Sequence, residues 1–175
     1  MKTIVYIGTS LDGYIAGKDG DIEWLTQYAN EEAIVAFEEL MVRIDAIVMG
    51  KNTFEKVLTF PTWPYEKKVF VLSNSMKEIP EHLIGKATLL SMRPAKLLQH
   101  LSENGFKTIY VDGGKVIQDF LKDDLIDELI ISKAPVIIGK GIPLFGEMDT
   151  MFRFKHNRTA VQSNGLVRSY YERAG

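Results

Sequence analysis

The chain contains no cysteine, which excludes disulfide bonds and cysteine metal sites and is compatible with a reducing compartment. It also lacks a strong charge of either sign, because its net charge is −2 and its pI is about 5.9. A basic nucleic-acid-binding surface is therefore not expected. The apolar run of residues 1–8 gives way to polar residues too soon for a signal peptide or a membrane-spanning helix. We expect a cytoplasmic protein that binds no nucleic acid, membrane or metal ion.

Hydrophobic residues make up 46% of the 175 residues, enough for one core, and we expect a single domain over residues 1–175. Short apolar runs alternate with segments of helical periodicity, a pattern typical of a mostly parallel sheet. Strands are expected at residues 3–8, 45–50, 68–72, 87–91, 108–111 and 127–133. Helices are expected at residues 30–43 and 93–104, and from residues 51 and 114 onward.

The C-terminal part has a different pattern. Residues 151–162 and 166–172 have strand character, and Ser163-Asn164-Gly165 between them is a strong hairpin signal. The predicted fold class is therefore α/β, with a mostly parallel sheet and an antiparallel hairpin at its edge.

Several predicted strands end in small or polar residues, and in an open α/β sheet ligands bind beyond these carboxyl ends. The clearest case is a strand, two glycines and a helix at residues 108–121. A backbone without Cβ atoms and the free N–H groups of a helix N-terminus would admit a pyrophosphate there. An ordinary turn, with Asp112 as the helix N-cap, is the alternative. Thr53 could either cap its own helix or bind an anion.

Two further segments have a functional and a structural interpretation. Lys51, Ser73 and Ser75 could bind a phosphate, but Lys51 could equally be solvated and the serines could simply form a turn. The glycine-rich loop of residues 10–20 is expected to be mobile and to cover a site. The usual G-x-G-x-x-G dinucleotide fingerprint is absent.

The motifs taken together resemble those of the dihydrofolate reductase-like superfamily. They are Ser-Leu-Asp-Gly-Tyr-Ile-Ala at 10–16, Met-Gly-Lys-Asn-Thr-Phe-Glu at 49–55, Val-Asp-Gly-Gly-Lys-Val at 111–116 and Ala-Pro-Val-Ile-Ile-Gly-Lys-Gly-Ile-Pro-Leu-Phe at 134–145. The resemblance is closest to the C-terminal reductase domain of the bifunctional riboflavin-biosynthesis deaminase–reductase. It implies a three-layer fold with helices on both faces of the sheet, an NADPH cofactor and a homodimer.

The resemblance also implies roles for individual residues. Trp24 and Phe37 would line the substrate side, with core packing as the alternative for both. Asp112, which matches a glutamate in pyrimidine reductases, would be the catalytic polar group. The NADPH-binding residues would be Ile15 and Ala16 at the nicotinamide, Gly50, Lys51, Asn52 and Thr53 at the phosphates, Ser73, Asn74 and Ser75 at the adenosine 2′-phosphate, and Gly113, Gly114, Lys115 and Val116 at the pyrophosphate.

One departure bears on the substrate. Dihydrofolate reductases carry an acidic residue on the first helix, and here the matching position falls on Ala33 or Ile34. We therefore expect an NADPH-dependent reductase of a small heterocycle, in first place a pyrimidine of the 5-amino-6-(5-phosphoribosylamino)uracil type. The alternatives are a dihydrofolate or pterin reductase, or a nucleotide-binding module without turnover.

Overall fold

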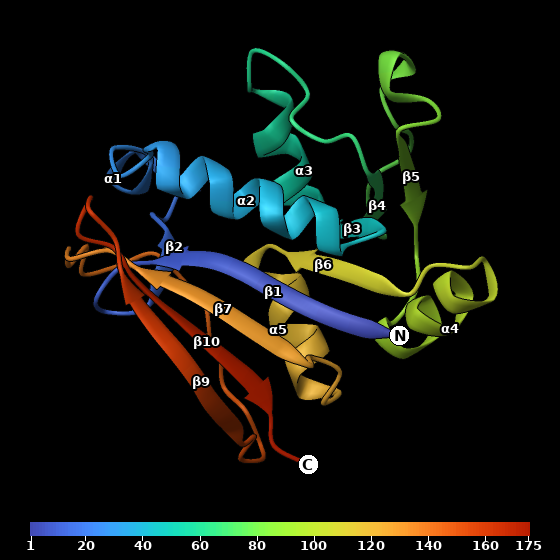
Figure 1. Cartoon of the computed structure of the whole chain (residues 1–175). Helices are drawn as coiled ribbons and strands as arrows, with labels where there is room; N and C mark the ends of the chain where they lie inside the picture. Colours follow the sequence, from blue (N-terminus) through green and yellow to red (C-terminus); the bar gives the residue numbers. More distant parts are fainter.

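The computed structural model describes all 175 residues and is built on one eight-stranded sheet (Figure 1). The strand order is β5-β4-β3-β6-β1-β7-β10-β9, and only β10 and β9 run antiparallel to their neighbours. The mostly parallel sheet and the antiparallel hairpin at its edge are thus confirmed. The strands are β1 (Lys2–Thr9), β3 (Ala46–Gly50), β4 (Lys68–Leu72), β5 (Ala87–Leu90), β6 (Thr108–Asp112), β7 (Glu128–Lys133), β9 (Phe154–Val161) and β10 (Val167–Arg173).

Helices cover both faces of the sheet, as expected (Figure 1). On one face lie α2 (Glu31–Arg43) and α3 (Lys51–Leu58), and on the other lie α4 (Pro94–Glu103) and α5 (Gly114–Lys122). The Asn30 side chain accepts a hydrogen bond from the Ala33 amide at 2.9 Å and so caps α2. Pro94 stands at the start of α4, where a missing N–H costs nothing.

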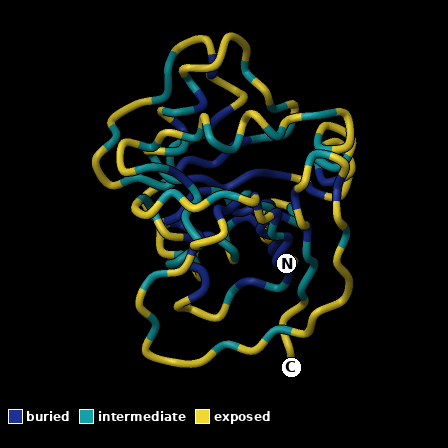
Figure 2. The backbone as a smooth tube through the Cα atoms, turned by 90° about the vertical axis from the view of Figure 1, so that its left-hand side faces the viewer, coloured by how far each residue is buried: buried dark blue, intermediate teal, exposed yellow.

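The core forms two apolar clusters, one on each side of the sheet. The cluster under α4 and α5 has fifteen buried residues, among them Leu97, Ile117 and Phe120. The cluster under α2 and α3 has twelve, including Leu40 and Phe54. In Figure 2 the buried segments run through the middle of the molecule and the exposed ones surround them. None of the helices is long and apolar enough to cross a membrane.

The loop predicted at residues 10–20 contains a strand. In it, β2 (Tyr14–Ala16) pairs antiparallel with β8 (Ile142–Pro143). The sequence did not predict this strand for two reasons. Glycines flank it and favour an irregular loop, and three residues are too few to show the alternation of apolar and polar residues that is typical of a strand. Two short helical segments were also not predicted, α1 (Glu23–Thr26) and the 3₁₀ turn η1 (Glu81–Leu83).

The outer edge of β9 has no partner in the sheet. This strand is largely exposed, with Val161 77% accessible beside Val167 of β10 at 38%. An unpaired and partly apolar edge is prone to pair with another chain. We predict that the protein is a homodimer that buries this hairpin. Light scattering at micromolar concentration should return twice the chain mass, and a monomer mass would contradict the prediction.

Candidate active site

A cleft of about 730 Å³ opens at the carboxyl ends of the parallel strands, the expected position for a ligand in this class of fold. It is lined by fourteen of the sixteen residues that the sequence nominated, drawn from four separate segments of the chain. They are Ile15, Ala16, Gly50, Lys51, Asn52, Thr53, Ser73, Asn74, Ser75, Asp112, Gly113, Gly114, Lys115 and Val116.

Two helices begin at this cleft. Gly50 is the N-cap of α3 and Gly113 is the N-cap of α5, and neither helix has a side-chain cap. The first N–H groups of both helices therefore remain available to an anion, and both helix dipoles favour negative charge there. This excludes capping as the role of Thr53 and of Asp112.

Gly113 is required by the geometry of the turn. Its φ of +91° is one that residues with a side chain rarely adopt, and a Cβ atom there would lie 2.2 Å from the Thr53 Oγ1 atom. The absence of a side chain lets the starts of α3 and α5 approach each other. The turn-geometry interpretation of this glycine is thus correct, and the close approach also brings the two helix N-termini to one place.

Gly114 has a different environment. It is buried, and a Cβ atom would lie 3.0 Å from Ile15 Cδ1 and 3.1 Å from Ile142 Cγ2. The paired strands β2 and β8 therefore close over the first turn of α5. This contact explains how Ile15, distant in sequence, lines the same cleft.

The β2 segment is attached to the loop before β8 by Asp12. Its carboxylate accepts hydrogen bonds from the Ser10 hydroxyl at 2.6 Å and from the Gly139 amide at 2.7 Å. These hydrogen bonds, that of Ser10 first, lower the pKa of Asp12, so the carboxylate stays ionised at neutral pH. The Ser-Leu-Asp-Gly motif thus has a structural role in fixing one wall of the cleft.

Asp112 places a carboxyl group in the cleft at the end of β6. Burial raises the pKa of Asp112 to about 6, against smaller opposing effects of the Tyr110 hydroxyl and the Gly113 amide. The Tyr110 hydroxyl itself donates to the Tyr6 carbonyl at 3.0 Å. Asp119 also lines the cleft, but it forms an ion pair with Lys115. Asp112 is consequently the carboxyl group best suited to exchange a proton near neutral pH.

Trp24 and Phe37, nominated for the substrate side, do not line the cleft. Phe37 packs against the core beneath α2, with its ring centroid 6.3 Å from that of Tyr6. Trp24 lies on α1, and its indole nitrogen is buried without a partner. Their proposed contact with a substrate stays a prediction.

Fourteen further residues line the cleft that sequence reasoning did not nominate. Several follow directly from their neighbours in sequence, but Tyr65 lies in a segment whose two prolines, Pro61 and Pro64, indicate only an irregular loop. The density of aromatic residues at Phe60, Trp63 and Tyr65 was the signal available for it. The fourteen are Ile7, Gly8, Gly20, Ile22, Leu25, Lys56, Val57, Phe60, Tyr65, Leu72, Met92, Pro94, Asp119 and Ile142.

The residues after β4 form a turn of their own. The Ser73 hydroxyl accepts hydrogen bonds from the backbone amides of Ser75 at 3.1 Å and Met76 at 3.0 Å. The Ser91 hydroxyl donates to the Asn74 side chain and joins this turn to the end of β5. Ser73 thus has the turn-forming role that the sequence left open, and Ser75 and Asn74 stay close to it.

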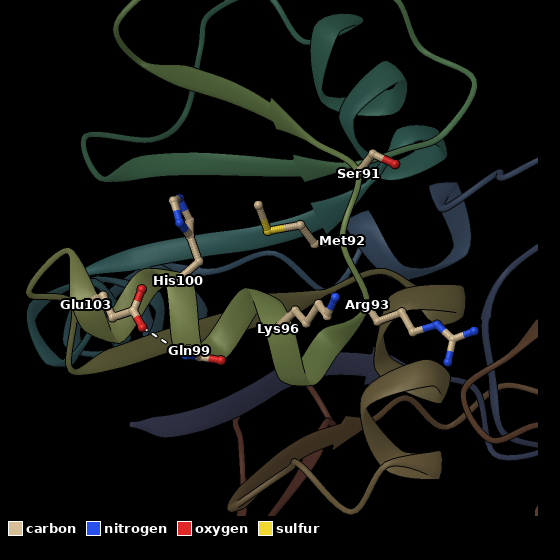
Figure 3. A pocket seen from close by; sticks show the side chains of 7 residues that line it. All are labelled: Ser91, Met92, Arg93, Lys96, Gln99, His100 and Glu103. Atoms are coloured by element: carbon tan, nitrogen blue, oxygen red, sulfur yellow. Dashed lines mark hydrogen bonds between the residues drawn. The ribbon is translucent and has the colours of Figure 1, made fainter.

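A second hollow of about 600 Å³ lies beside this turn, along α4 (Figure 3). Its lining includes three basic side chains, Arg93, Lys96 and His100, and it shares Met92 with the cleft. Along α4, the Gln99 side chain donates a hydrogen bond to Glu103 at 2.9 Å (Figure 3). In Figure 3, Arg93 points away from Met92 and His100. The hollow adds positive charge next to the Ser73–Ser75 end of the cleft.

Comparison with known proteins agrees with this geometry. The family model of the RibD C-terminal domain matches residues 1–167. The chain belongs to the RibD C-terminal domain family. A solved structure from Shewanella sp. PV-4, provisionally described as a riboflavin biosynthesis protein, is 43% identical with a TM-score of 0.94, and the match covers 100% of both chains.

Two more distant structures share the fold of this RibD C-terminal domain. The Thermotoga maritima diaminohydroxyphosphoribosylaminopyrimidine deaminase/5-amino-6-(5-phosphoribosylamino)uracil reductase is 19% identical with a TM-score of 0.76, and the match covers 99% of this chain and 56% of that one. Dihydrofolate reductase from Enterococcus faecalis, complexed with NADP(H), is 16% identical with a TM-score of 0.72, over 99% and 97% of the two chains. The fold is dihydrofolate reductase-like.

Proposed function

We propose that this RibD C-terminal domain is an NADPH-dependent oxidoreductase that reduces a small flat heterocycle, in first place a pyrimidine of the riboflavin-biosynthesis type. The observation that carries the proposal is the single cleft into which two uncapped helix N-termini and fourteen nominated residues converge. The family and the described roles of its relatives in riboflavin biosynthesis and uracil reduction support the same reaction class.

The residues present fit the cofactor. The amides at the starts of α3 and α5 would bind the pyrophosphate, because neither helix has a side-chain cap and Gly113 lets the two N-termini approach each other. Ile15 would pack against the nicotinamide and help to exclude water from it. NADPH, when bound, supplies the hydride, and the protein orients the acceptor and stabilises the charge that develops on it.

Reduction of a C=N or C=O bond of the acceptor requires a proton as well as a hydride, and Asp112 is the group proposed to donate it. The glutamates of α2 at positions 31, 32, 38 and 39 are all exposed, so none of them supplies the carboxyl that dihydrofolate reductases place on this helix. This absence favours a pyrimidine over dihydrofolate as the natural acceptor. NADPH oxidation is therefore expected with acceptors of the 5-amino-6-(5-phosphoribosylamino)uracil type and is not expected with dihydrofolate.

Turnover distinguishes a reductase from a module that only binds the nucleotide. Oxidation of NADPH, followed at 340 nm, should depend on a pyrimidine or pterin acceptor and on the protein concentration. NADPH binding without oxidation by any member of such a panel would favour the binding module and reject the enzyme.

We predict a preference for NADPH over NADH. Lys51 and Ser75 line the cleft toward the end proposed for the 2′-phosphate, and Arg93 lines the adjoining hollow. Lys51 also forms an ion pair with Glu55, with 3.7 Å between the charged atoms. NADPH should bind at least roughly tenfold more tightly at low ionic strength, and the difference should narrow as salt rises. Calorimetric titrations at two salt concentrations measure this, and equal affinities would refute it.

A further inference from the structure

Tyr65 is held rigidly at the cleft by a row of aromatic rings. Its ring packs edge-on against Trp63, with centroids 5.4 Å apart, and Trp63 packs edge-on against Phe54 at 5.9 Å. Phe54 is fully buried in the core under α3. The loop between α3 and β4 is thereby folded back, so that a half-buried tyrosine from it lines the cleft. A side chain fixed in this way has little conformational entropy to lose when it binds a ligand.

The hydroxyl group of Tyr65 has no hydrogen-bond partner within the chain, in contrast to that of Tyr110, which donates to Tyr6. Burial raises the pKa of Tyr65 well above its ordinary value, and the nearby Asp112 carboxylate raises it further. The phenol therefore keeps its proton at every physiological pH. A fixed, unpaired donor stands beside the proposed proton donor, in the same cleft.

We propose that Tyr65 is a specificity-determining residue whose hydroxyl donates a hydrogen bond to a ring carbonyl oxygen of the acceptor. The inference rests on the proposed function and adds an acceptor contact to it. Tyr65 keeps its own proton throughout, whereas Asp112 gives one up, so the two groups have separate tasks. A ligand that offers this donor no hydrogen-bond acceptor should bind much more weakly, because the hydroxyl would then stay unpaired. The acceptor should consequently be an oxo-substituted ring.

The test is the variant Tyr65→Phe, which keeps the ring and its packing and removes only the hydroxyl. The probes are 5,6-diaminouracil and its two mono-oxo analogues, titrated calorimetrically against the full chain saturated with NADP⁺. In the wild-type protein, one analogue should bind at least tenfold more weakly than 5,6-diaminouracil. In Tyr65→Phe, 5,6-diaminouracil should fall to the affinity of that analogue, and the difference should disappear.

Tyr171→Phe is the matched control, because Tyr171 packs on His156 of the C-terminal hairpin and does not line the cleft. It should keep the wild-type discrimination, and both variants should bind NADPH as the wild type does. Any of three results would overturn the inference. They are equal affinities of all three probes for the wild type, failure of all three to bind, and discrimination that survives in Tyr65→Phe. A failure of NADPH itself to bind would reject the proposed function, and this is read directly from the cofactor titration.

Discussion

Asp112→Asn is expected to lower turnover by roughly a hundredfold while leaving the fold and the affinity for NADPH intact. The amide has nearly the shape of the carboxyl group but has no acidic proton to give. Steady-state kinetics with the best acceptor, together with a cofactor titration, measure the two effects separately. Asp123→Asn, which changes an exposed carboxyl at the other end of α5, is the matched control and should behave as the wild type.

The same residue should set the pH dependence of the reaction. Because the pKa of Asp112 is raised to about 6, the protonated donor predominates below that pH and decreases about tenfold per unit above it. The wild-type kcat/KM should therefore fall as pH rises through 6, and the profile of Asp112→Asn should be flat. Full activity in the variant, or an unchanged profile, would show that Asp112 is not the proton donor.

Asp112→Asn should raise stability at neutral pH although it lowers activity. The folded-state pKa of Asp112 lies above its ordinary value of 3.8, so the folded protein binds more protons than the unfolded chain between about pH 4 and 6. Its free energy of unfolding consequently falls as pH rises across this window and is then constant. At pH 8, Asp112→Asn should be more stable than the wild type by up to about 3 kcal/mol, and near pH 4 the difference should vanish.

The two neighbouring glycines are expected to respond differently to alanine. Gly113→Ala should destabilise the protein by about 3 kcal/mol or more, since it strains a backbone at φ +91° and places a methyl group against Thr53 Oγ1. Gly114→Ala should be close to neutral in stability, because its contacts are the ends of the Ile15 and Ile142 side chains and alanine favours the helix. Denaturant unfolding compares the two variants.

Gly114→Ala should nevertheless weaken NADPH binding at least tenfold. The methyl group would lie against Ile15 Cδ1 and displace that side chain from the proposed nicotinamide position. A loss of stability without a loss of NADPH affinity would assign Gly114 to packing alone. Gly113→Ala is the comparison variant, since it alters the adjacent residue of the same turn. A loss of NADPH affinity without a loss of stability in Gly114→Ala would therefore be specific to Gly114.

The α/β fold class and the strand ends that form the cleft could be predicted from local patterns, whereas Ile15 and Ala16 followed only from the family resemblance. Apolar runs fix the buried strands, and small residues after them mark the carboxyl ends that meet at one edge of the sheet. Gly50 and Gly113 could be placed in this way, and so could the antiparallel hairpin. The short pairing of β2 with β8 joins residues more than 120 positions apart, and no local pattern specifies such a contact.

Tyr65, Trp24 and Phe37 show where sequence reasoning reaches its limit. All three are aromatic, and whether an aromatic ring faces a cleft or the core depends on the packing of distant elements. Tyr65 lines the cleft because Trp63 and Phe54 hold it there, whereas Phe37 is covered by the core under α2. The pKa of Asp112 could not be predicted either, because it results mainly from burial by the folded chain.

A crystal structure of the protein with NADP⁺ bound tests the central claim most directly. The account predicts a pyrophosphate bound by the amides at the starts of α3 and α5, with the nicotinamide beside Ile15 and its C4 atom facing the part of the cleft that holds Asp112 and Tyr65. Nucleotide bound elsewhere on the molecule, or no bound nucleotide at saturating concentration, would contradict it.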